Sequence, residues 1–443
     1  MRGHEELATL RRAAREIFDE ALADADPARA TRDAVRLEGS RLLVAGDAFE
    51  LNDSRVYSVA FGKAARAMAS ALDSALGARL AAGVLSAPAS EHRLARWQTF
   101  AGGHPVPNEE SLRAARAAFE LLARADAEGA PVIFLVSGGG SAMLEAPGDA
   151  RLTLEDLRAA NRALVACGAP IAEVNAVRRA LSAVKGGRLA ARAPRSPQAS
   201  LVVSDVNAGE EANVASGPTC PAPADSPDPA QVVARHGLDS LLPARVVAVI
   251  RDARARAPAH DDARAPRAHH VLLDNARAVG RAARAARERG FAVEVARDLV
   301  EQDVAEGSRS LVARLMEFRE RVGAQAARGV CLVSGGEFAC RVRGDGVGGR
   351  NCETALRCAL EMGTTDLRMV ALAAGTDGVD GNSPAAGALA DSTTLTRALE
   401  KRLDPRRFLE ASDGYTFFDA LGDAVTTGPT GTNVRDLRIV LAR

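Results

Sequence analysis

The stretch that decides the fold reads Val132-Ile133-Phe134-Leu135-Val136-Ser137-Gly138-Gly139-Gly140-Ser141. It joins a short apolar run to a glycine-rich turn, which is the pattern of a strand that is buried on both faces and ends in a tight loop. Residues 56–63 repeat this pattern, and the turn at Gly62 leads into an alanine-rich helix. Because short apolar strands alternate with helical segments, the sequence predicts an α/β fold with a mostly parallel sheet that helices cover on both faces.

The chain is too long for one ordinary hydrophobic core. Its 443 residues predict two domains, or one large α/β domain with a companion. A proline-rich stretch at 217–223 ends the first series of strands and helices, so we divide the chain into an N-terminal domain over 1–240 and a C-terminal domain over 241–443. In the second domain the pattern predicts helices over 275–289 and 303–321, and strands over 269–273, 291–296, 330–333 and 339–342.

Charge and composition limit the partners of this protein. Lysine plus arginine equals aspartate plus glutamate, at 57 each, so no net field favours nucleic acid or an acidic membrane surface. Aromatic residues make up 3% of the chain, too few for a surface that stacks bases, and no apolar run reaches the roughly 20 residues that span a bilayer. The six cysteines fall in no metal-binding or disulfide pattern. We therefore expect a cytoplasmic protein that has no nucleic-acid or membrane partner. The sequence leaves the choice between a monomer and a homodimer open.

Lysine is rare in this chain, and its positions are informative. Of the 57 basic residues only Lys63, Lys185 and Lys401 are lysines, and the first two lie in glycine-bearing segments. Lysine presents a compact ammonium where arginine presents a larger planar fork, so a tight phosphate or carboxylate pocket can require lysine. We therefore expect Lys63 and Lys185 at a binding site, although Lys185 also suits the end of a surface helix capped by Gly186. Lys401 lies in a polar stretch and is expected on the surface.

The glycine-rich loop that follows Val136 is a candidate anion site. Its three glycines, 138 to 140, let backbone amides converge on an anion, and the hydroxyls of Ser137 and Ser141 add donors. A plain tight turn is the alternative. The loop is not a Walker A motif, because no Gly-Lys-Ser/Thr follows it. Ligands of parallel sheets bind beyond the carboxyl ends of the strands, which is where this loop and Lys63 fall.

A second glycine-rich region begins at Ser334-Gly335-Gly336-Glu337 and continues at Gly344-Asp345-Gly346-Val347-Gly348-Gly349-Arg350-Asn351. Its second part contains GxGxxG ahead of an expected helix, and Asp366 stands 20 residues past Gly346, as in a dinucleotide site. The ribose-binding acid should however end the next strand, and Asp366 precedes that strand. The fingerprint therefore keeps open an alternative function, that of an NAD(P)H-dependent reductase.

Three aspartates, Asp205, Asp377 and Asp380, follow expected strands at loop positions. Mg²⁺ takes one or two such carboxylates together with phosphate oxygens, although a turn or a helix cap explains each aspartate alone. Together with two anion-binding loops and Arg350, they complete the parts of a phosphoryl-transfer site: a cradle, a cation, a metal ion and a base. His104, in the stretch Gly-Gly-His-Pro-Val-Pro at 102–107, stands out among the histidines by its motif-like context, and an ordinary loop position is its alternative.

At these residues the chain resembles the glycerate 2-kinases of the MOFRL family, some of which carry the older name hydroxypyruvate reductase. The resemblance implies a large doubly wound, mostly parallel N-terminal α/β domain, a smaller mixed α/β C-terminal domain, and an active site in the cleft between them. It also implies that ATP and Mg²⁺ serve to phosphorylate D-glycerate at its 2-hydroxyl, which gives 2-phosphoglycerate. The matching segments follow the family's order and lie at 60–64, 102–107, 136–142, 175–189, 204–206, 215–219, 334–337, 343–351, 374–381 and 427–434.

The resemblance further implies roles for single residues. Lys63 matches the family's active-site lysine and is expected to contact the substrate or the transferring phosphoryl group, while Arg350 is expected to neutralise charge in the transition state. Asp205 and Asp377 are expected as catalytic residues and metal ligands, with Glu337 competing for the same tasks. The expected cofactor-binding residues are Ser137, Gly138, Gly139, Gly140, Ser141, Lys185, Gly335, Gly336, Glu337 and Asn351.

The chain also departs from the family pattern. Residues 207–211 read Asn-Ala-Gly-Glu-Glu where the family usually has Pro-Gly-Asp-Asp, and 382–384 read Asn-Ser-Pro in place of Pro-Thr-Asp. Phe338 stands where a small hydroxyl residue is common, and Cys352 where glutamine is common. These changes leave three alternatives: a kinase for a related small hydroxy acid, an NAD(P)H-dependent hydroxypyruvate reductase, and a catalytically silent sensor.

Overall fold

The computed structural model describes residues 2–51, 54–253, 264–323, 326–363 and 367–443, which form two compact units. The amino-terminal unit is Pro27–Leu272, and the carboxy-terminal unit combines Met1–Asp26 with Leu273–Arg443. These units differ from the predicted division at 240, because the chain leaves the first sheet only after Leu272. The first residues join the second unit because their helix, α1 (Arg2–Asp24), packs on the second sheet.

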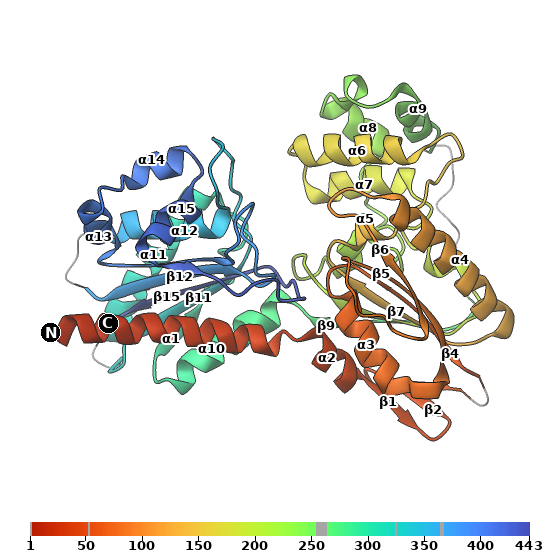
Figure 1. Cartoon of the computed structure of the whole chain (residues 1–443), viewed down its shortest axis with the longest axis horizontal. Coiled ribbons are helices and arrows are strands. Elements are labelled where there is room, and N and C mark those ends of the chain that lie inside the picture. The colour runs from red at the N-terminus through yellow and green to blue at the C-terminus, as the bar shows by residue number, and fades with distance from the viewer. Residues whose placement is uncertain (1, 52–53, 254–263, 324–325, 364–366) are drawn as a thin grey trace. The chain divides into compact units, whose positions relative to one another are not determined.

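A six-stranded sheet forms the centre of the amino-terminal unit (Figure 1). Its strands, in spatial order, are β6 (Trp97–Ala101), β5 (Leu80–Ala87), β4 (Val56–Phe61), β7 (Val132–Ser137), β8 (Gln198–Val203) and β9 (Arg267–Leu273). The pairs from β6 through β8 are all parallel. Every residue of β4, β7 and β8 is buried, as their unbroken apolar runs predict. The predicted parallel sheet is confirmed.

The strand order reverses between β4 and β7. From β4 the chain passes through α3 (Ala65–Leu76) to β5 and β6, and then returns through α4 (Glu109–Glu128) to β7 on the other side of β4. Because parallel crossovers are right-handed, this reversal puts α3 and α4 on opposite faces of the sheet. The chain leaves β4 and β7 in opposite directions along the sheet, so the loops after these two strands mark the switch point, which is where parallel sheets bind ligands.

The remaining elements of the amino-terminal unit flank this sheet. A small antiparallel sheet follows α2 (Pro27–Ala34), and the helices α6 to α9 pack around a shared apolar cluster. Their bounds are β1 (Val35–Glu38), β2 (Arg41–Val44), β3 (Asp47–Glu50), α5 (Gly140–Met143), α6 (Leu154–Ala166), α7 (Ile171–Leu181), α8 (Pro229–Arg235) and α9 (Ala244–Ala253), with 3-10 turns at Gly77–Arg79, Ala190–Arg192, Glu211–Ser216 and Leu238–Ser240.

The carboxy-terminal unit has a mixed sheet. Its strands, in spatial order, are β10 (Ala292–Val295), β11 (Val330–Gly336), β15 (Asp436–Ala442), β12 (Met369–Gly375), β13 (Gly387–Asp391) and β14 (Ala424–Val425). β10 and β11 are parallel, whereas the pairs from β11 to β14 are antiparallel. The predicted mixed α/β domain is confirmed. The strand expected at 339–342 is wrong, because Val342 and its neighbours are exposed and Ala339 makes an isolated bridge to Asp303.

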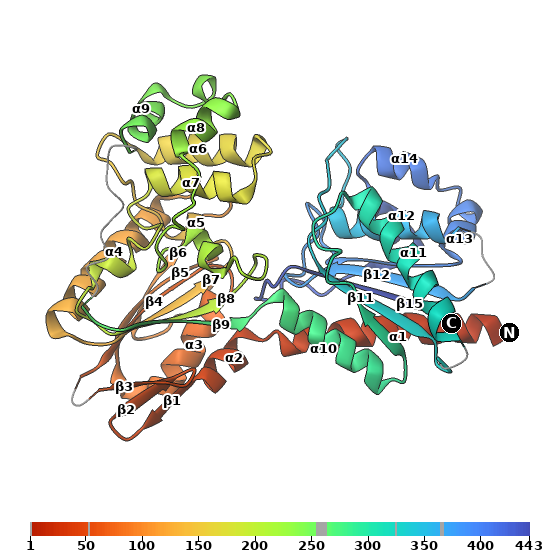
Figure 2. The same cartoon turned by 180° about the vertical axis from the view of Figure 1, so that it is seen from behind.

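Helices cover both faces of this second sheet (Figures 1 and 2). α1 and α10 (Asn275–Glu288) lie side by side on one face, and α11 (Val304–Val322) and α12 (Arg350–Met362) pack together on the other. Three shorter helices, α13 (Thr394–Glu400), α14 (Pro405–Glu410) and α15 (Gly414–Leu421), follow β13. Among the described residues we find no helix with both the length and the apolar character needed to cross a membrane.

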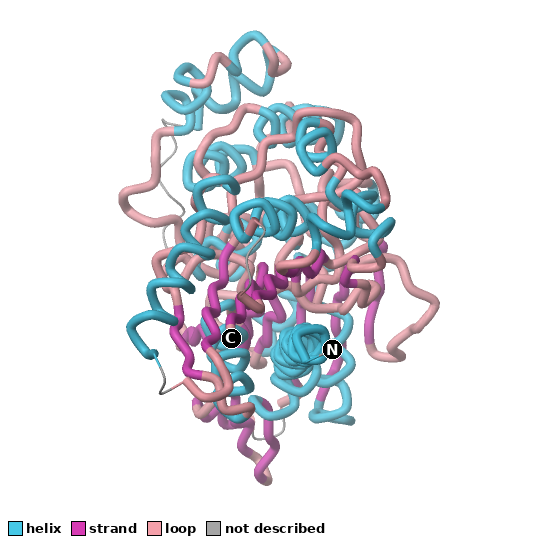
Figure 3. The backbone as a smooth tube through the Cα atoms, turned by 90° about the vertical axis from the view of Figure 1, so that its left-hand side faces the viewer, coloured by secondary structure: helices cyan, strands magenta, loops and turns pink. Residues whose placement is uncertain are grey.

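Helix α1, which Figure 3 views nearly along its axis, is tied to the second sheet by a buried charge cluster. The guanidinium of Arg11 contacts the carboxylates of Asp391 and Asp423, whose side chains are 2% and 3% exposed. Arg397 reaches the same two carboxylates and lies 2.6 Å from Asp423 Oδ2. Burial alone would raise the pKa of Asp391, but hydrogen bonds from Thr393 and the charges of the two arginines lower it.

We predict that Arg11→Met lowers the free energy of unfolding by about 3 kcal/mol, because it leaves two buried carboxylates with one arginine. Urea unfolding followed by far-UV circular dichroism measures this loss. Arg15→Met is the matched control: Arg15 pairs with Asp19 on the same helix, both side chains are more than a third exposed, and such a pair contributes at most about 1 kcal/mol. Equal losses in the two variants would contradict the prediction.

The Arg11 effect should also depend on pH. A carboxylate with a depressed folded-state pKa contributes stability above its unfolded pKa of about 3.9, and that contribution falls as the pH drops through the folded-state value. The difference in stability between the wild type and Arg11→Met should therefore be full at neutral pH and shrink below about pH 4.

Candidate active site

The loops after β4 and β7 are joined directly at the switch point. The Lys63 amide donates to the Gly138 carbonyl at 2.9 Å, and the Ala64 amide donates to the Ser137 hydroxyl at 3.1 Å. Gly62 makes this approach possible, since its φ is +113° and a β carbon there would lie 2.4 Å from the Ser137 carbonyl oxygen. Ser137 is 1% exposed, so its hydroxyl joins the two strands, and the prediction that it binds a cofactor directly does not match its place.

Three polar side chains surround the triple-glycine loop. A β carbon on Gly138 would lie 2.1 Å from Asp205 Oδ2, so the carboxylate lies directly against the loop backbone. A β carbon on Gly139 would lie 2.9 Å from His104 Cδ2 and 3.3 Å from Lys63 Cγ. The structure therefore brings Lys63, Asp205 and His104, which come from three separate segments, to one glycine loop. These glycines are required because any side chain would displace the polar groups beside them.

The loop that carries His104 is fixed by hydrogen bonds. Asn108 and Ser111 form a capping box at the start of α4, and Ser111 also accepts the Gly103 amide at 3.0 Å. The Asn108 side-chain amide donates to the Ala101 carbonyl at 2.9 Å. The His104–Pro105 peptide bond is cis. The sequence pattern marked His104 as a candidate but did not give it a role, because its neighbours at the loop lie far away along the chain.

Ser141 belongs to a second layer of hydrogen bonds around the loop. Its hydroxyl is 2.9 Å from the hydroxyl of Ser216, which donates to Asn175 Oδ1 at 2.8 Å. The Ser216 carbonyl accepts from Arg179 Nε at 3.3 Å. Asn175, Arg179 and Ser216 lie in segments that resemble the family, but their partners were not predictable from spacing.

Lys185, predicted above as a cofactor-binding residue, is buried in an ion pair instead. Its ammonium contacts the Glu145 carboxylate, and the two side chains are 1% and 4% exposed. The other carboxylate oxygen accepts from the Ser182 hydroxyl at 2.6 Å. Burial lowers the pKa of Lys185, and the Glu145 charge opposes that effect. The next residue, Gly186, donates to the Ser216 carbonyl at 3.3 Å, so the pair supports the turn that holds Ser141.

In the carboxy-terminal unit, Arg350 is held between two carboxylates. Its Nε lies 2.6 Å from Asp436 Oδ2, and its Nη2 lies 2.8 Å from Glu337 Oε1. Burial would lower the pKa of Arg350, but the carboxylates of Asp436 and Glu337 raise it above its ordinary value. Asp436 is 1% exposed and was missed by the sequence analysis, because it is the first residue of β15 and lies in no glycine-rich loop.

Gly335, Gly336 and Asn351 are predicted cofactor-binding residues, and the structure uses their backbones internally. A β carbon on Gly335 would lie 1.9 Å from Asn275 Oδ1, and the Gly336 amide donates to the same oxygen at 2.8 Å. The Asn351 amide donates to Asp380 Oδ1 at 2.9 Å. Asp380, 2% exposed, therefore caps α12, and burial raises its pKa.

Asp377 lies beside the Arg350 cluster. A β carbon on Gly375 would lie 3.2 Å from Asp377 Oδ1 and 3.4 Å from Asp436 Oδ1. Asp377 Oδ1 also accepts the Val379 amide at 3.2 Å, which is an aspartate turn. The predicted residues Glu337, Arg350 and Asp377 are thus brought to one end of the second sheet, together with Asp436.

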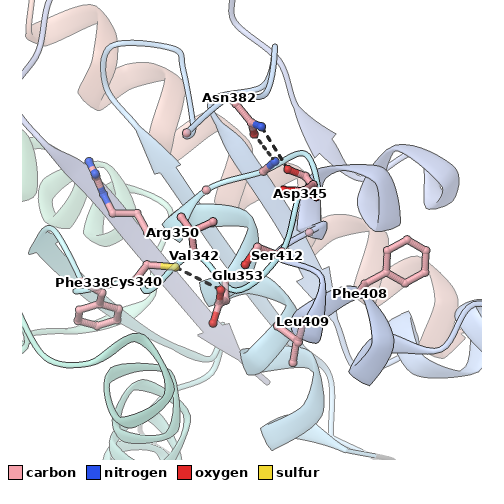
Figure 4. A pocket seen from close by; sticks show the side chains of 16 residues that line it. Phe338, Cys340, Val342, Asp345, Arg350, Glu353, Asn382, Phe408, Leu409 and Ser412 are labelled. Carbon is pink, nitrogen blue, oxygen red and sulfur yellow. Dashed lines mark hydrogen bonds between the residues drawn. The ribbon is translucent and has the colours of Figure 1, made fainter. Parts of the chain in front are cut away.

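A groove of about 640 Å³ adjoins the glycine-rich loop that precedes Arg350 (Figure 4). It lies between residues 338–350, the Gly381–Asn382 turn, and the segment from Phe408 to Gly414. Asn382 holds the glycine-rich loop at 344–349 in place. Its Oδ1 accepts the Gly348 amide at 2.8 Å, and its Nδ2 donates to the Gly346 carbonyl at 3.1 Å. The asparagine that departs from the family pattern therefore has a structural task.

Comparison with known proteins identifies relatives of the whole chain. The family described as Domain of unknown function (DUF4147) matches residues 13–251, and the one described as MOFRL family matches residues 330–436. An Agrobacterium vitis protein with the provisional name hydroxypyruvate reductase is 36% identical over 97% of this chain and 94% of its own length. The D-glycerate 2-kinase of Thermotoga maritima is 34% identical over 88% of this chain and 92% of its own length.

A solved structure is similar over almost the entire chain. The crystal structure of a glycerate kinase from Thermotoga maritima matches with a TM-score of 0.82 and 32% sequence identity, covering 98% of this chain and 100% of that chain. This chain belongs to the MOFRL family of glycerate kinases. The sequence resemblance is confirmed by these matches.

Two departures from the MOFRL pattern now have a physical account. Phe338 is 2% exposed, and its ring lies 3.7 Å from the Arg438 guanidinium and packs against Gly307, where a β carbon would be 2.5 Å away. In the altered loop at 207–211, the carboxylate of Glu211 accepts the Gly209 amide at 2.8 Å, so this acid stabilises its own turn. Nothing in the structure explains Cys352 beyond its complete burial.

We predict that Lys185→Met lowers the free energy of unfolding by about 3 to 5 kcal/mol, because Glu145 is left buried and unpaired. The double variant Lys185→Met/Glu145→Gln removes both charges and should recover most of that loss. Denaturant unfolding of the two variants and the wild type measures both effects. An unchanged free energy of unfolding in Lys185→Met would contradict this structural role of the ammonium.

Proposed function

We propose that this protein is a glycerate 2-kinase, which transfers the γ-phosphoryl group of ATP to the 2-hydroxyl of D-glycerate and yields 2-phosphoglycerate. One observation carries the proposal: Lys63, His104 and Asp205 meet at a triple-glycine loop, at the switch point of a parallel sheet, in a chain of the MOFRL family. Glycine amides, an ammonium and a carboxylate are what binding and reaction of a small anionic hydroxy acid require.

Each candidate residue has a separate task in the transfer of the phosphoryl group. The Lys63 ammonium binds the glycerate carboxylate or the transferring phosphoryl group, and the loop at 138–141 binds anionic oxygens through its amides. Arg350, held in place by Asp436 and Glu337, neutralises negative charge on the phosphoryl group. Asp205 lies close enough to the loop to orient the acceptor hydroxyl or to accept its proton. The reaction requires glycerate as the acceptor and ATP as the donor. It can take place in a monomer or in a homodimer.

The carboxylates also fit Mg²⁺. Within the described parts of the chain, no group of three or more His, Cys, Asp or Glu side chains could hold a metal ion. Mg²⁺ retains water and phosphate ligands and takes one or two carboxylates, so a metal ion that arrives with ATP suits this donor set. Asp205 in the amino-terminal unit and Asp377 in the carboxy-terminal unit are the candidate protein ligands, each proposed within its own unit. When bound, Mg²⁺ would offset charge on the phosphate oxygens.

The NAD(P)H-dependent reductase is the weaker candidate, although two Agrobacterium vitis relatives bear the name hydroxypyruvate reductase. Each glycine of the GxGxxG fingerprint contacts its own chain: a β carbon on Gly344 or Gly346 would meet the Ala411 carbonyl oxygen at 2.9 and 2.5 Å, and one on Gly349 would meet Asp380 Oδ1 at 2.4 Å. These glycines are therefore explained without a dinucleotide. The proposed ribose acid, Asp366, lies outside the described residues.

We predict that purified protein with D-glycerate, ATP and Mg²⁺ forms 2-phosphoglycerate and ADP, and that EDTA abolishes the reaction until Mg²⁺ is restored. Mass spectrometry with authentic 2- and 3-phosphoglycerate standards identifies the product. The parallel reaction contains hydroxypyruvate with NADH or NADPH, and no oxidation of the nucleotide is expected. Oxidation without ADP formation would favour the reductase, and ADP formed only with another hydroxy acid would change the acceptor.

For Lys63, we predict that Lys63→Arg lowers kcat/KM for glycerate by about 100-fold, because the planar guanidinium displaces the ligand by about 1 Å at a backbone-lined site. Lys401→Arg is the control: Lys401 is exposed and donates to the Ala420 carbonyl, so its activity should be that of the wild type. Circular dichroism checks that both variants fold. Near-normal turnover of Lys63→Arg would refute the requirement for lysine.

A further inference from the structure

The groove beside Arg350 is larger than the proposed acceptor needs. Its volume of about 640 Å³ lies in the range of sites for drug-sized molecules and cofactors. A three-carbon acid would leave most of this space to water. A ligand that fills the groove is therefore a second, larger molecule.

Part of the groove's lining is apolar, and two of the lining residues are phenylalanines. Phe338 is held between Arg438 and Gly307, and Phe408 packs edge-to-face on Phe417 with ring centroids 5.5 Å apart. Val342 is 78% exposed and lines the groove. In Figure 4, Phe338 and Phe408 lie at opposite ends, with Glu353 between them. A flat apolar body that covers Val342 would remove this surface from water.

Polar groups line the same groove at defined places. Glu353 is fixed by Arg357 and Arg343, with Glu353 Oε1 2.7 Å from Arg357 Nη2 and 3.1 Å from Arg343 Nη1. Ser412 accepts the Arg343 amide at 2.9 Å, and Asp345 is exposed at the rim. Glu353 is 4% exposed and already paired, whereas the exposed Asp345 carboxylate and the Ser412 hydroxyl suit sugar hydroxyls or an exocyclic amine as hydrogen-bond donors. These acceptor groups disfavour a ligand that brings a carboxylate to this part of the groove, such as a fatty acid.

One lining residue, Arg350, marks where the ligand should be anionic. Its guanidinium already pairs with Asp436 and Glu337, and its side chain remains 35% exposed. The groove thus offers an apolar slot, hydrogen-bond acceptors for hydroxyl and amine groups, and a fixed cation at one side. We propose that it binds the nucleoside part of the phosphoryl donor, a purine nucleotide, with its phosphates directed toward Arg350. This inference rests on the proposed kinase function and adds the location of the donor.

The test measures binding of ADP and of adenosine to the full-length protein by isothermal titration calorimetry. In Val342→Glu, a charge replaces the exposed apolar side chain, so the affinity for both ligands should fall about ten-fold and the KM for ATP should rise accordingly. Adenosine is included because it has no phosphate, so its loss of affinity cannot come from charge repulsion. Leu409→Ala, which removes another part of the wall, should weaken both ligands in the same direction.

Leu399→Glu is the matched control. Leu399 is 77% exposed in the same unit and does not line this groove, so neither affinity should change. The KM for glycerate should also be unchanged in Val342→Glu. If the wild type forms 2-phosphoglycerate but both groove variants bind ADP and adenosine as the wild type does, the nucleoside binds elsewhere and this inference is overturned, while the kinase function stands. If the wild type makes no phosphoglycerate but Val342→Glu weakens both ligands, the groove is supported and the acceptor assignment fails.

Discussion

The hydrogen bond from the Lys63 amide to the Gly138 carbonyl is the contact on which the amino-terminal site depends. It joins the ends of β4 and β7 at the place where the strand order reverses, and Ser137 strengthens the join by accepting the Ala64 amide. Because these hydrogen bonds hold the two strand ends together, the backbone of Lys63 has a fixed position beside Gly139. A flexible side chain on a fixed backbone loses less entropy on binding than one on a mobile loop. The glycines at 62 and 138–140 are required by this crowding, and Gly62 and Gly139 are also required by their positive φ.

The carboxy-terminal unit achieves a similar rigidity with buried charge. Asp436 holds Arg350 through two nitrogen atoms, while Arg438, on the same strand and facing the same way, donates to Ser334 and to the Gly335 carbonyl. Burial lowers the pKa of Arg438 to about 10, yet its hydrogen bonds and the Phe338 ring compensate for lost hydration. Asp436 and Arg438 lie two residues apart on β15. Asp436 therefore fixes Arg350, and Arg438 fixes the end of β11 that leads to Glu337.

Much of the fold could be predicted because strands and loops have local signatures. The buried runs at 56–61 and 132–137 and the helices near 275–289 and 303–321 are all present. The division of the chain was harder, since α1 reaches the second sheet through Arg11 and two aspartates about 400 residues away. The strand expected at 339–342 failed for a related reason: apolar alternation there serves a loop that lines a groove, with no neighbouring strand to pair with.

The lysines separate what the sequence determined from what the tertiary structure decided. Scarcity and a glycine neighbour singled out both Lys63 and Lys185, with the weaker case for Lys185, because both properties are local. The structure turns one toward the triple-glycine loop and buries the other against Glu145. Sequence alone thus determined the strand–glycine–helix pattern, the family, and the residue types at the site. Which carboxylate meets which cation was decided by tertiary packing, because the cost of removing a charge from water depends on everything that surrounds it.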